Sequence, residues 1–232
     1  MINKVVAIVP AAGLGRRFGE GTNKPLEILG GRPLMLWALR ALEAAGEISE
    51  IIPVVKANDM AYCAELAEEY NISKVRRIVP GGRERQDSVF HGLQSVDDPE
   101  SIVVVHDGVR PLIEPEVIAR GIAQLEDNDG VVIGVPVKDT VKEAAEGMVK
   151  QTLDRTLLWA AQTPQIFPYR VLLDAFEKAM QERFYATDDS ALVERYGGKI
   201  KMVPGSYTNI KVTTPEDLLI AALFLEARNS GA

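Results

Sequence analysis

Apolar runs alternate with helical patterns along most of this chain, and this alternation restricts its fold more than any other feature. The runs fall near Val5–Pro10, Ile51–Val55, Val75–Val79, Ile102–His106, Val131–Val135 and Ile200–Val203. The helical patterns cover Pro33–Ala45, Asp59–Tyr70, Glu84–Ser95, Pro115–Leu125, Tyr169–Arg183 and Pro215–Ala227. Strands that are apolar throughout are buried on both faces. The pattern therefore predicts an α/β fold with a mostly parallel sheet and helices on both of its faces.

Length and composition limit the classes of protein to consider. The chain has 232 residues, enough for one large α/β domain or two small ones. Because no linker, repeat or low-complexity tract interrupts the alternation, we expect a single domain over residues 1–232. A formal charge of −7 argues against a nucleic-acid surface. With no apolar stretch of membrane-spanning length and no signal-peptide pattern, we expect a cytoplasmic protein without a membrane partner.

The first strand leads into a loop of small residues and cations. Pro10-Ala11-Ala12-Gly13-Leu14-Gly15-Arg16-Arg17 follows the apolar run, and Lys24 comes seven residues later. Glycine and alanine allow a phosphate to approach the main chain, and the arginines and the lysine supply positive charge. The loop is therefore predicted to bind a triphosphate, although glycine-rich turns also occur without any ligand.

The spacing of this loop excludes two other phosphate-binding loops. No Gly-Lys-Ser/Thr follows Gly13 or Gly15 at the separation that a Walker A loop requires. In a dinucleotide-binding loop the third glycine would fall at position 18, where this chain has Phe18. An acidic residue at the end of a second strand is also missing, so NAD binding is disfavoured.

Ligands of parallel α/β folds bind beyond the carboxyl ends of the strands. This rule places Ala11–Arg17, Gly81–Arg85 and Asp107–Arg110 along one edge of the predicted sheet. The second segment precedes Ser88 and could bind a nucleobase edge, or it could be an ordinary helix-entry turn. In the third, Asp107 and Arg110 could bind phosphate or substrate, or form a structural ion pair.

Nucleophilic catalysis has little support in the sequence. The chain has only two histidines, His91 and His106, and no Gly-x-Ser-x-Gly elbow. Its single cysteine, Cys63, lies in a helical pattern and is predicted to be a small core residue. A lone cysteine also excludes an intrachain disulfide and most structural metal sites. Lys211 offers a further cation, or it is an ordinary solvated lysine.

Several strings, taken together, resemble one known family. They are Pro-Ala-Ala-Gly-x-Gly-x-Arg at 10–17, Lys24, Gly-Gly-x-x-Arg-x-Asp-Ser at 81–88, His-Asp-x-x-Arg-Pro at 106–111, Asp139-Thr140, Asp154-Arg155, Gln162-Thr163-Pro164-Gln165, Thr187-Asp188 and Asn209-Ile210-Lys211-Val212-Thr213. In this order they resemble the 2-C-methyl-D-erythritol 4-phosphate cytidylyltransferases over nearly the whole chain. The resemblance implies a Rossmann-like nucleotidyltransferase fold and cytidylyl transfer from CTP to methylerythritol phosphate, with release of pyrophosphate, in the non-mevalonate isoprenoid pathway.

The resemblance also implies roles for individual residues. Charge stabilisation at the α-phosphorus would come from Arg17, Lys24 and Lys211. CTP would be bound by Pro10, Ala11, Ala12, Gly13, Gly15, Gly82, Arg83, Ser88 and Asp107. The acceptor would be bound by Asp107, Arg110, Thr140, Arg155, Thr163 and Thr187. Mg²⁺ would be held mainly through the CTP phosphates, so no metal ligands are expected from the protein itself.

A β-arm is predicted at about residues 137–159. Two short polar-apolar segments surround Ala144-Ala145-Glu146-Gly147 there, as in a hairpin. In the family this arm crosses to the other subunit. The resemblance therefore implies a homodimer in which Thr140 and Arg155 complete the partner's substrate pocket, although the arm could instead be only a dimer clasp.

Some positions depart from the family pattern and keep alternatives open. Lys24 lies in Asn-Lys-Pro where the family commonly has Pro-Lys-Gln, and Gly108-Val109 replaces a pair of alanines. Val109 mildly favours a ribitol-5-phosphate cytidylyltransferase, whereas Pro10–Gly13 argues against it. A catalytically inactive nucleotide-binding regulator is a third hypothesis, opposed by the retention of Arg17, Lys24 and Lys211 together.

Overall fold

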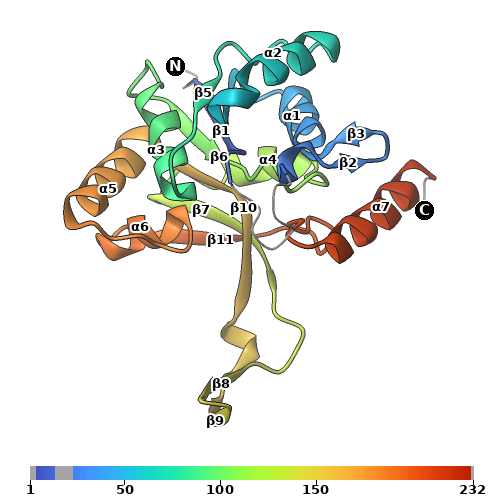
Figure 1. Ribbon diagram of the computed structural model, residues 1–232. Helices are drawn as coiled ribbons and strands as arrows, with labels where there is room; N and C mark the ends of the chain where they lie inside the picture. Colours follow the sequence, from blue (N-terminus) through green and yellow to red (C-terminus); the bar gives the residue numbers. More distant parts are fainter. Residues whose placement is uncertain (1–3, 14–22, 231–232) are drawn as a thin grey trace.

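A seven-stranded sheet forms the centre of the protein in the computed structural model, which describes residues 4–13 and 23–230 (Figure 1). Its strand order is β11-β7-β10-β6-β1-β4-β5. The strands are β1 (Val5–Pro10), β4 (Glu50–Val55), β5 (Val79–Pro80), β6 (Ile102–Val105), β7 (Gly130–Pro136), β10 (Trp159–Pro168) and β11 (Ile200–Pro204). Strand β10 is antiparallel to both of its neighbours, and every other pair in this sheet is parallel. The mostly parallel α/β fold predicted from the sequence is thus confirmed.

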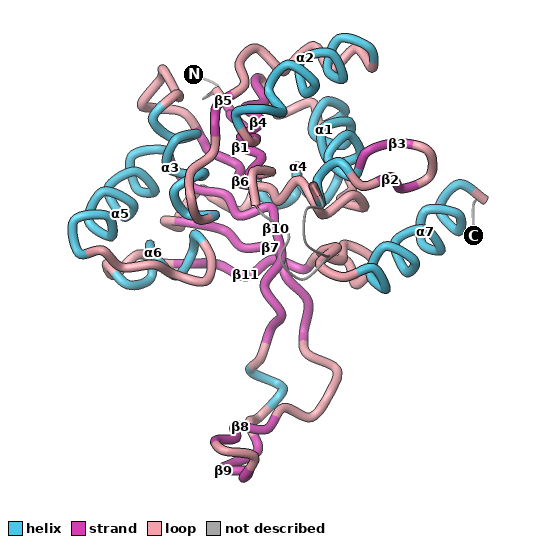
Figure 2. The backbone as a smooth tube through the Cα atoms, viewed as in Figure 1, coloured by secondary structure: helices cyan, strands magenta, loops and turns pink. Residues whose placement is uncertain are grey.

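Helices cover both faces of the sheet (Figure 2). One face packs against α1 (Leu34–Ala44), α2 (Met60–Glu69) and α4 (Pro115–Ile122), and the other against α3 (Arg85–Gln94), α5 (Tyr169–Glu182) and α6 (Asp189–Arg195). Strand β1 illustrates why both faces are apolar. Its Val5, Ala7 and Val9 belong to the first core cluster, whereas Val6 and Ile8 belong to the second. Alternate side chains of one strand thus fill both cores.

The strand predicted at Val75–Val79 is much shorter in the structure. Only Val79–Pro80 forms β5, and Val75 makes a single bridge to Ile51. Because Ile51 pairs with Val75 but Val54 pairs with Val79, one extra residue lies between the two pairings. Such an insertion breaks the hydrogen-bond ladder. The prediction of a full strand is therefore wrong here, although the segment does run beside β4.

Some other elements were not predicted. Strand β10 occupies the middle of the sheet, where the sequence indicated only the end of the arm at Trp159. Helix α6 and a small hairpin of β2 (Ile28–Leu29) and β3 (Arg32–Pro33) were also missed. This hairpin, α1 and α7 (Pro215–Asn229) enclose a third, smaller apolar cluster that includes Leu29, Leu34, Val212 and Leu225.

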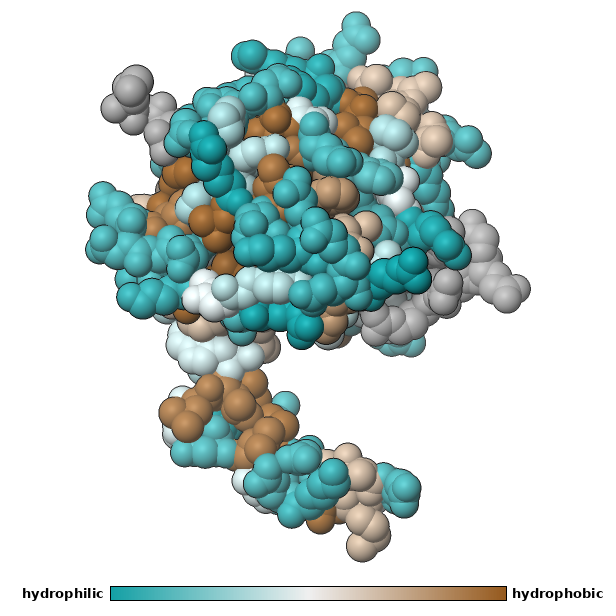
Figure 3. Space-filling model, turned by 90° about the vertical axis from the view of Figure 1, so that its left-hand side faces the viewer, coloured by the Kyte–Doolittle hydropathy of each residue, from teal (hydrophilic) through white to brown (hydrophobic). Residues whose placement is uncertain are grey.

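The predicted arm is present and projects from the body of the protein (Figures 1 and 2). It carries a hairpin of β8 (Lys142–Ala145) and β9 (Met148–Thr152) and a short helix, η3 (Arg155–Leu157). Glu146 and Gly147 form the turn with φ angles of 52° and 78°, a left-handed conformation that glycine favours. Hydrophobic residues gather on the arm close to the body (Figure 3). Leu157 in η3 is 79% exposed.

Candidate functional site

Three loops meet at one edge of the sheet. The N–H of Ala11 donates to Val54 O at 2.7 Å, the N–H of Gly81 to Val55 O at 2.8 Å, and the N–H of Gly108 to Pro10 O at 3.3 Å. A Cβ added to Gly81 would lie 2.2 Å from Cβ of Ala12, so the first two loops touch. For the residues that the structure describes, the predicted convergence beyond the strand ends is confirmed.

The second loop is held by its own side chains. Oγ of Ser88 accepts the N–H of Gly82 at 3.1 Å and donates to the carbonyl of Glu84 at 3.1 Å. Ser88 is buried, whereas Arg83 is exposed. In this structure the Ser88 hydroxyl therefore shapes the loop, and the base-reading role predicted for it stays a prediction.

Asp107 lies at the centre of a cluster of cations. Its Oδ1 accepts from Nε of Arg85 at 2.9 Å, and its Oδ2 lies 2.8 Å from Nζ of Lys211. Nε of Arg110 is farther away, 3.8 Å from Oδ2. Burial would raise the pKa of Asp107, but the nearby Arg85, Lys211 and Arg110 outweigh it and hold that pKa well below its ordinary value. Asp107 is therefore a buried carboxylate that keeps its charge.

Arg85 links this cluster to α6. Its Nη1 and Nη2 bind the two carboxylate oxygens of Asp189 at 2.9 and 2.8 Å, while its Nε binds Asp107. Burial alone would lower the pKa of Arg85, but the two carboxylates together raise it. The sequence predicts no individual role for Arg85 or Asp189. Arg85 lay within the string at 81–88, but its partner Asp189 is distant in sequence and no spacing connects the two.

Arg110 has a second partner besides Asp107, with which an ion pair was one of the predicted alternatives. Its Nη1 donates to the carbonyl of Asn209 at 2.7 Å, and the 3.8 Å separation from Asp107 makes a weak ion pair. Burial lowers the pKa of Arg110, whereas Asp107 opposes this shift. Lys211 follows Asn209 by two residues, so Arg110 fixes the loop that carries Lys211. Lys211, one alternative for which was an ordinary solvated lysine, is instead bound to Asp107.

Thr163 and His106 hold the loop that carries Asp107 and Arg110. The N–H of Asp107 donates to Oγ1 of Thr163 at 3.0 Å, and Oγ1 lies 3.1 Å from Nδ1 of His106. Nε2 of His106 lies 3.2 Å from the carbonyl of Arg110, which can only accept. His106 therefore carries its proton on Nε2 and accepts the Thr163 hydroxyl at Nδ1. Burial lowers the pKa of His106 to about 4, so the ring is neutral at physiological pH.

The start of α6 is fixed by strand β10. Oε1 of Gln165 accepts the N–H groups of Asp189 and Ser190 at 3.1 and 2.9 Å, and its Nε2 donates to Asp188 at 2.7 Å. Thr187, a predicted acceptor-binding residue, is exposed just before this helix begins. Gln165 thus holds Asp189 in position for Arg85.

The remaining predicted residues are not all brought to Asp107. Thr140 and Arg155 are exposed on the arm, where Nη1 of Arg155 donates to the carbonyl of Lys138 at 2.6 Å. Lys24 begins the short helix η1 (Lys24–Leu26), beside Asn23, whose Nδ2 donates to Asp59. Gly13 is exposed at the end of the first described loop segment. Gly15 and Arg17 lie outside the described residues.

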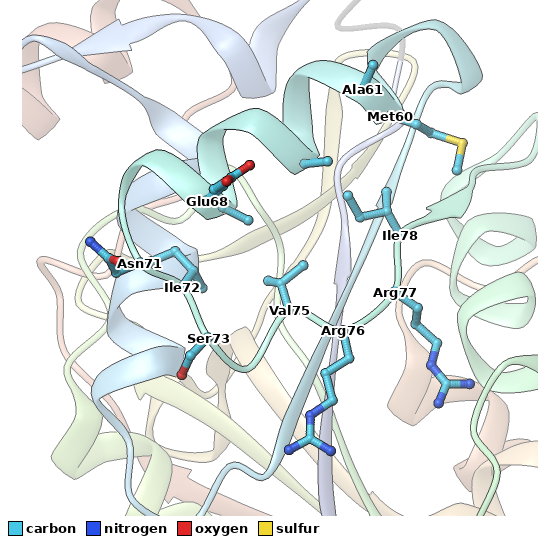
Figure 4. Close-up of a pocket in the computed structure, with 12 residues that line it drawn as sticks. Met60, Ala61, Glu68, Asn71, Ile72, Ser73, Val75, Arg76, Arg77 and Ile78 are labelled. Atoms are coloured by element: carbon cyan, nitrogen blue, oxygen red, sulfur yellow. The ribbon is translucent and has the colours of Figure 1, made fainter.

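A separate cavity of about 730 Å³ lies between α2 and residues 71–78 (Figure 4). Val75 and Ile78 point toward the helix across it, whereas the side chains of Arg76 and Arg77, which also line the cavity, point away from the helix. None of the predicted site residues lines this cavity. The cluster around Asp107 is therefore the candidate site.

Within residues 4–13 and 23–230, no helix is long and apolar enough to cross a membrane.

Comparison with known proteins identifies the family. The sequence profile described as IspD, 2-C-methyl-D-erythritol 4-phosphate cytidylyltransferase, matches residues 5–227. The chain belongs to this family. The 2-C-methyl-D-erythritol 4-phosphate cytidylyltransferase of Syntrophus aciditrophicus is 45% identical to it over 225 residues, 96% of each chain. The crystal structure of 4-diphosphocytidyl-2C-methyl-D-erythritol synthase from Anaerococcus prevotii matches with a TM-score of 0.86 and 35% identity, covering 97% of each chain.

A second curated relative gives the same result. The 2-C-methyl-D-erythritol 4-phosphate cytidylyltransferase of Geotalea uraniireducens is 43% identical over 230 residues, 98% of this chain and 99% of that one. The family resemblance inferred from the ordered motifs is therefore confirmed. Membership also favours the IspD assignment over the ribitol-phosphate alternative.

Proposed function

We propose that this chain transfers a cytidylyl group from CTP to 2-C-methyl-D-erythritol 4-phosphate. A phosphate oxygen of the acceptor attacks the α-phosphorus in line, the bond from that phosphorus to the β-phosphate oxygen breaks, and pyrophosphate leaves. The observation that carries the proposal is the group of cations around Asp107, set where three strand-end loops meet in a member of this family. Such a reaction requires positioning and charge stabilisation rather than a protein nucleophile.

In this proposal each cation has a task. Lys211, with a side chain 36% exposed, is open to a phosphate from solvent, and Lys24 and Arg17 hold the triphosphate with it. Arg110 supports the acceptor side of the site. The loop segments at Pro10–Gly13 and Gly82–Ser88 bind the nucleotide together with Gly15. Thr187, Asp107 and Thr163 bind the acceptor.

Mg²⁺ fits the site as a companion of CTP rather than as a resident of the protein. Asp107 is paired with Arg85 through Oδ1 and has Arg110 as well as Lys211 near Oδ2, so it is a poor ligand for a further positive ion. Among the described residues no group of three or more His, Cys, Asp or Glu side chains gathers to hold a metal. Bound to the phosphates, Mg²⁺ would neutralise part of their charge.

We also propose that the arm joins two copies of this single-domain protein. Met148 and Val149 on the hairpin and Leu157 nearer the body are 75%, 59% and 79% exposed, more apolar surface than a small hairpin normally leaves in water. Exchange of arms would bury this surface and bring Thr140 and Arg155 to the partner's acceptor site. A cytoplasmic location is proposed with it, since the enzyme draws on the common nucleotide pool.

The test is pyrophosphate release from CTP and Mg²⁺ by the purified protein with two acceptors compared in parallel. Methylerythritol phosphate should support turnover and ribitol 5-phosphate should not. Lys24→Ala should abolish release while the far-ultraviolet circular dichroism spectrum stays unchanged. Release with ribitol 5-phosphate alone would support cytidylyl transfer but contradict the proposed acceptor. CTP binding without pyrophosphate release in the presence of either acceptor would indicate the inactive regulator.

A further inference from the structure

We propose that Arg85 keeps Asp107 charge-compensated when Lys211 leaves that carboxylate for a nucleotide phosphate, which makes Arg85 a positioning residue for Lys211. The inference rests on the proposed function, because it assigns Lys211 to the phosphates. It concerns a residue that does not itself contact substrate in this scheme.

The contacts at Asp107 divide the carboxylate between two cations. Arg85 Nε takes Oδ1 at 2.9 Å and Lys211 Nζ takes Oδ2 at 2.8 Å. Arg110 lies 3.8 Å from Oδ2 and has its own strong hydrogen bond to Asn209. When Lys211 moves away, Arg85 is therefore the close partner that remains.

Burial makes this remaining partner necessary. The side chain of Asp107 is 6% exposed, and an ionised carboxylate left unpaired in such a place is strongly disfavoured. Without Arg85, the departure of Lys211 would leave only Arg110, at 3.8 Å, as compensation from the described residues. Lys211 would then stay on Asp107, and less of its charge would be available to a phosphate.

Lys211 is the cation best suited to move. Its side chain is 36% exposed, compared with 28% for Arg85 and 10% for Arg110. A lysine has a flexible stem and a compact charge that can change partners, whereas the Arg85 guanidinium is fixed by three hydrogen bonds to two carboxylates. The backbone on its C-terminal side is anchored, because Val212 N–H donates to Val109 O at 2.9 Å. Lys211 is therefore expected to change partner by movement of its side chain, with the backbone held in place.

Asp189 affects how strongly Arg85 binds Asp107. It binds the other two guanidinium nitrogens in a bidentate pair and therefore competes with Asp107 for the same cation. Removing the charge of Asp189 should strengthen the hold of Arg85 on Asp107 and make release of Lys211 easier. Removing Arg85 should have the opposite effect. If Arg85 and Asp189 only stabilised the fold, either substitution should weaken CTP binding.

The experiment is a double-mutant cycle on CTP binding, measured by calorimetry in the presence of Mg²⁺. Arg85→Met should weaken CTP binding about tenfold in the wild-type background. In an Asp107→Asn background the same substitution should change affinity less than twofold, because no charged carboxylate then competes with the phosphate for Lys211. Equal losses in both backgrounds would overturn the inference.

Two single variants keep the test decisive if Arg85→Met folds poorly. Arg85→Lys retains a cation near Asp107 and should bind CTP within about threefold of the wild type. Asp189→Asn should bind CTP as tightly as the wild type or more tightly, and a tenfold loss in a variant with unchanged thermal melting would overturn the inference. Arg170→Ala, which removes an exposed arginine paired with Glu100, is the matched control and should change nothing.

The outcome is distinguishable from a failure of the proposed function. A wild-type protein that binds CTP but releases no pyrophosphate with methylerythritol phosphate overturns the function. The double-mutant cycle, which measures CTP binding, still decides the role of Arg85. Turnover with the acceptor together with equal losses in the cycle overturns only the role of Arg85. A wild-type protein that binds no CTP overturns both.

Discussion

Individual side chains of the site serve several neighbours at once. Asp107 binds Arg85 and Lys211, and Arg85 in turn binds Asp189. Thr163 accepts from the Asp107 backbone and donates to His106. Because each group has two commitments, a substitution at one of them changes the charge or geometry felt by the next. Residues with no contact to substrate are thus expected to affect activity.

His106 should make stability depend on pH. Its pKa is lowered to about 4 in the folded protein, below an unfolded value of about 6.5. The unfolded chain therefore binds more protons between these values. This contribution is fully present above pH 6.5 and is lost as pH falls toward 4, by about 3 kcal/mol in the free energy of unfolding.

Denaturant titrations from pH 4 to 7 would measure this contribution. His106→Asn cannot titrate, so its unfolding free energy should fall less steeply over this interval than that of the wild type. The carboxylates titrate in both proteins, so the difference between the two pH dependences isolates the contribution of His106. Identical slopes would show that His106 is not held neutral.

Gly81 should tolerate no side chain. A Cβ there would lie 2.2 Å from Cβ of Ala12 and 3.0 Å from Oγ of Ser88. Gly81→Ala is expected to destabilise the protein by about 1–3 kcal/mol and to weaken CTP binding, because the two loops must separate. Thermal melting and calorimetry measure the two effects. Gly46→Ala is the control, since a Cβ at Gly46 meets nothing within 4 Å, and an equal effect of both substitutions would contradict the packing argument.

At the scale of elements, the apolar strands were predictable and the polar strand was not. Burial on both faces gives β1, β6 and β7, and β4 from Ile51 onward, a continuous apolar sequence that can be recognised in a single chain. The central strand β10 contains Gln162, Thr163, Pro164 and Gln165, a composition typical of a loop. Those polar side chains are needed in the core because they hold Asn209, His106 and Asp188.

The candidate site was predictable in its location but not in its connections. The strand-end rule indicates the loops after β1, β5 and β6 from sequence alone. It does not indicate that Arg85 binds Asp189, because α6 is a seven-residue helix with little periodicity and its position depends on Gln165. Long-range ion pairs of this kind follow from the assembled fold rather than from local spacing.

The arm should be separable from the rest of the fold. Replacing residues 142–152 by an Asn-Gly turn removes β8 and β9, which pair only with each other in the sheets described. The body should keep its thermal melting temperature, while the dimer and the activity should be lost. Sedimentation and pyrophosphate release measure these. A truncated protein that stays dimeric would contradict the proposed role of the arm.

At the scale of the whole molecule, the proposed site draws on two chains. Asp107, Arg110 and Lys211 belong to the body, whereas Thr140 and Arg155 lie on an arm that points away from it (Figure 1). If the arms are exchanged, each site combines the body of one chain with the arm of the other. Two differently damaged chains could then restore one site between them.

Mixing inactive variants tests this arrangement. Lys211→Ala damages only the body's part of a site, and Arg155→Ala only the arm's part. Each homodimer should have little activity, but refolding the two together in equal amounts should recover roughly a quarter of wild-type turnover, because half of the dimers then hold one intact site. Pyrophosphate release after mixing measures the recovery. If the mixture is no more active than its components, the arm completes a site within its own chain.

Strand β10 also predicts where the length of this protein can change in related sequences. It runs from Trp159 at the base of the arm to Pro168 inside the body. Successive side chains of a strand face opposite ways, so one residue inserted between Gln165 and Ile166 would exchange Ile166 and Phe167 between the two cores that they fill, where neither side chain matches the space left by the other. An insertion at Glu146 would only extend the hairpin. Evolution can therefore lengthen the arm at its tip, whereas the number of residues at its root is fixed.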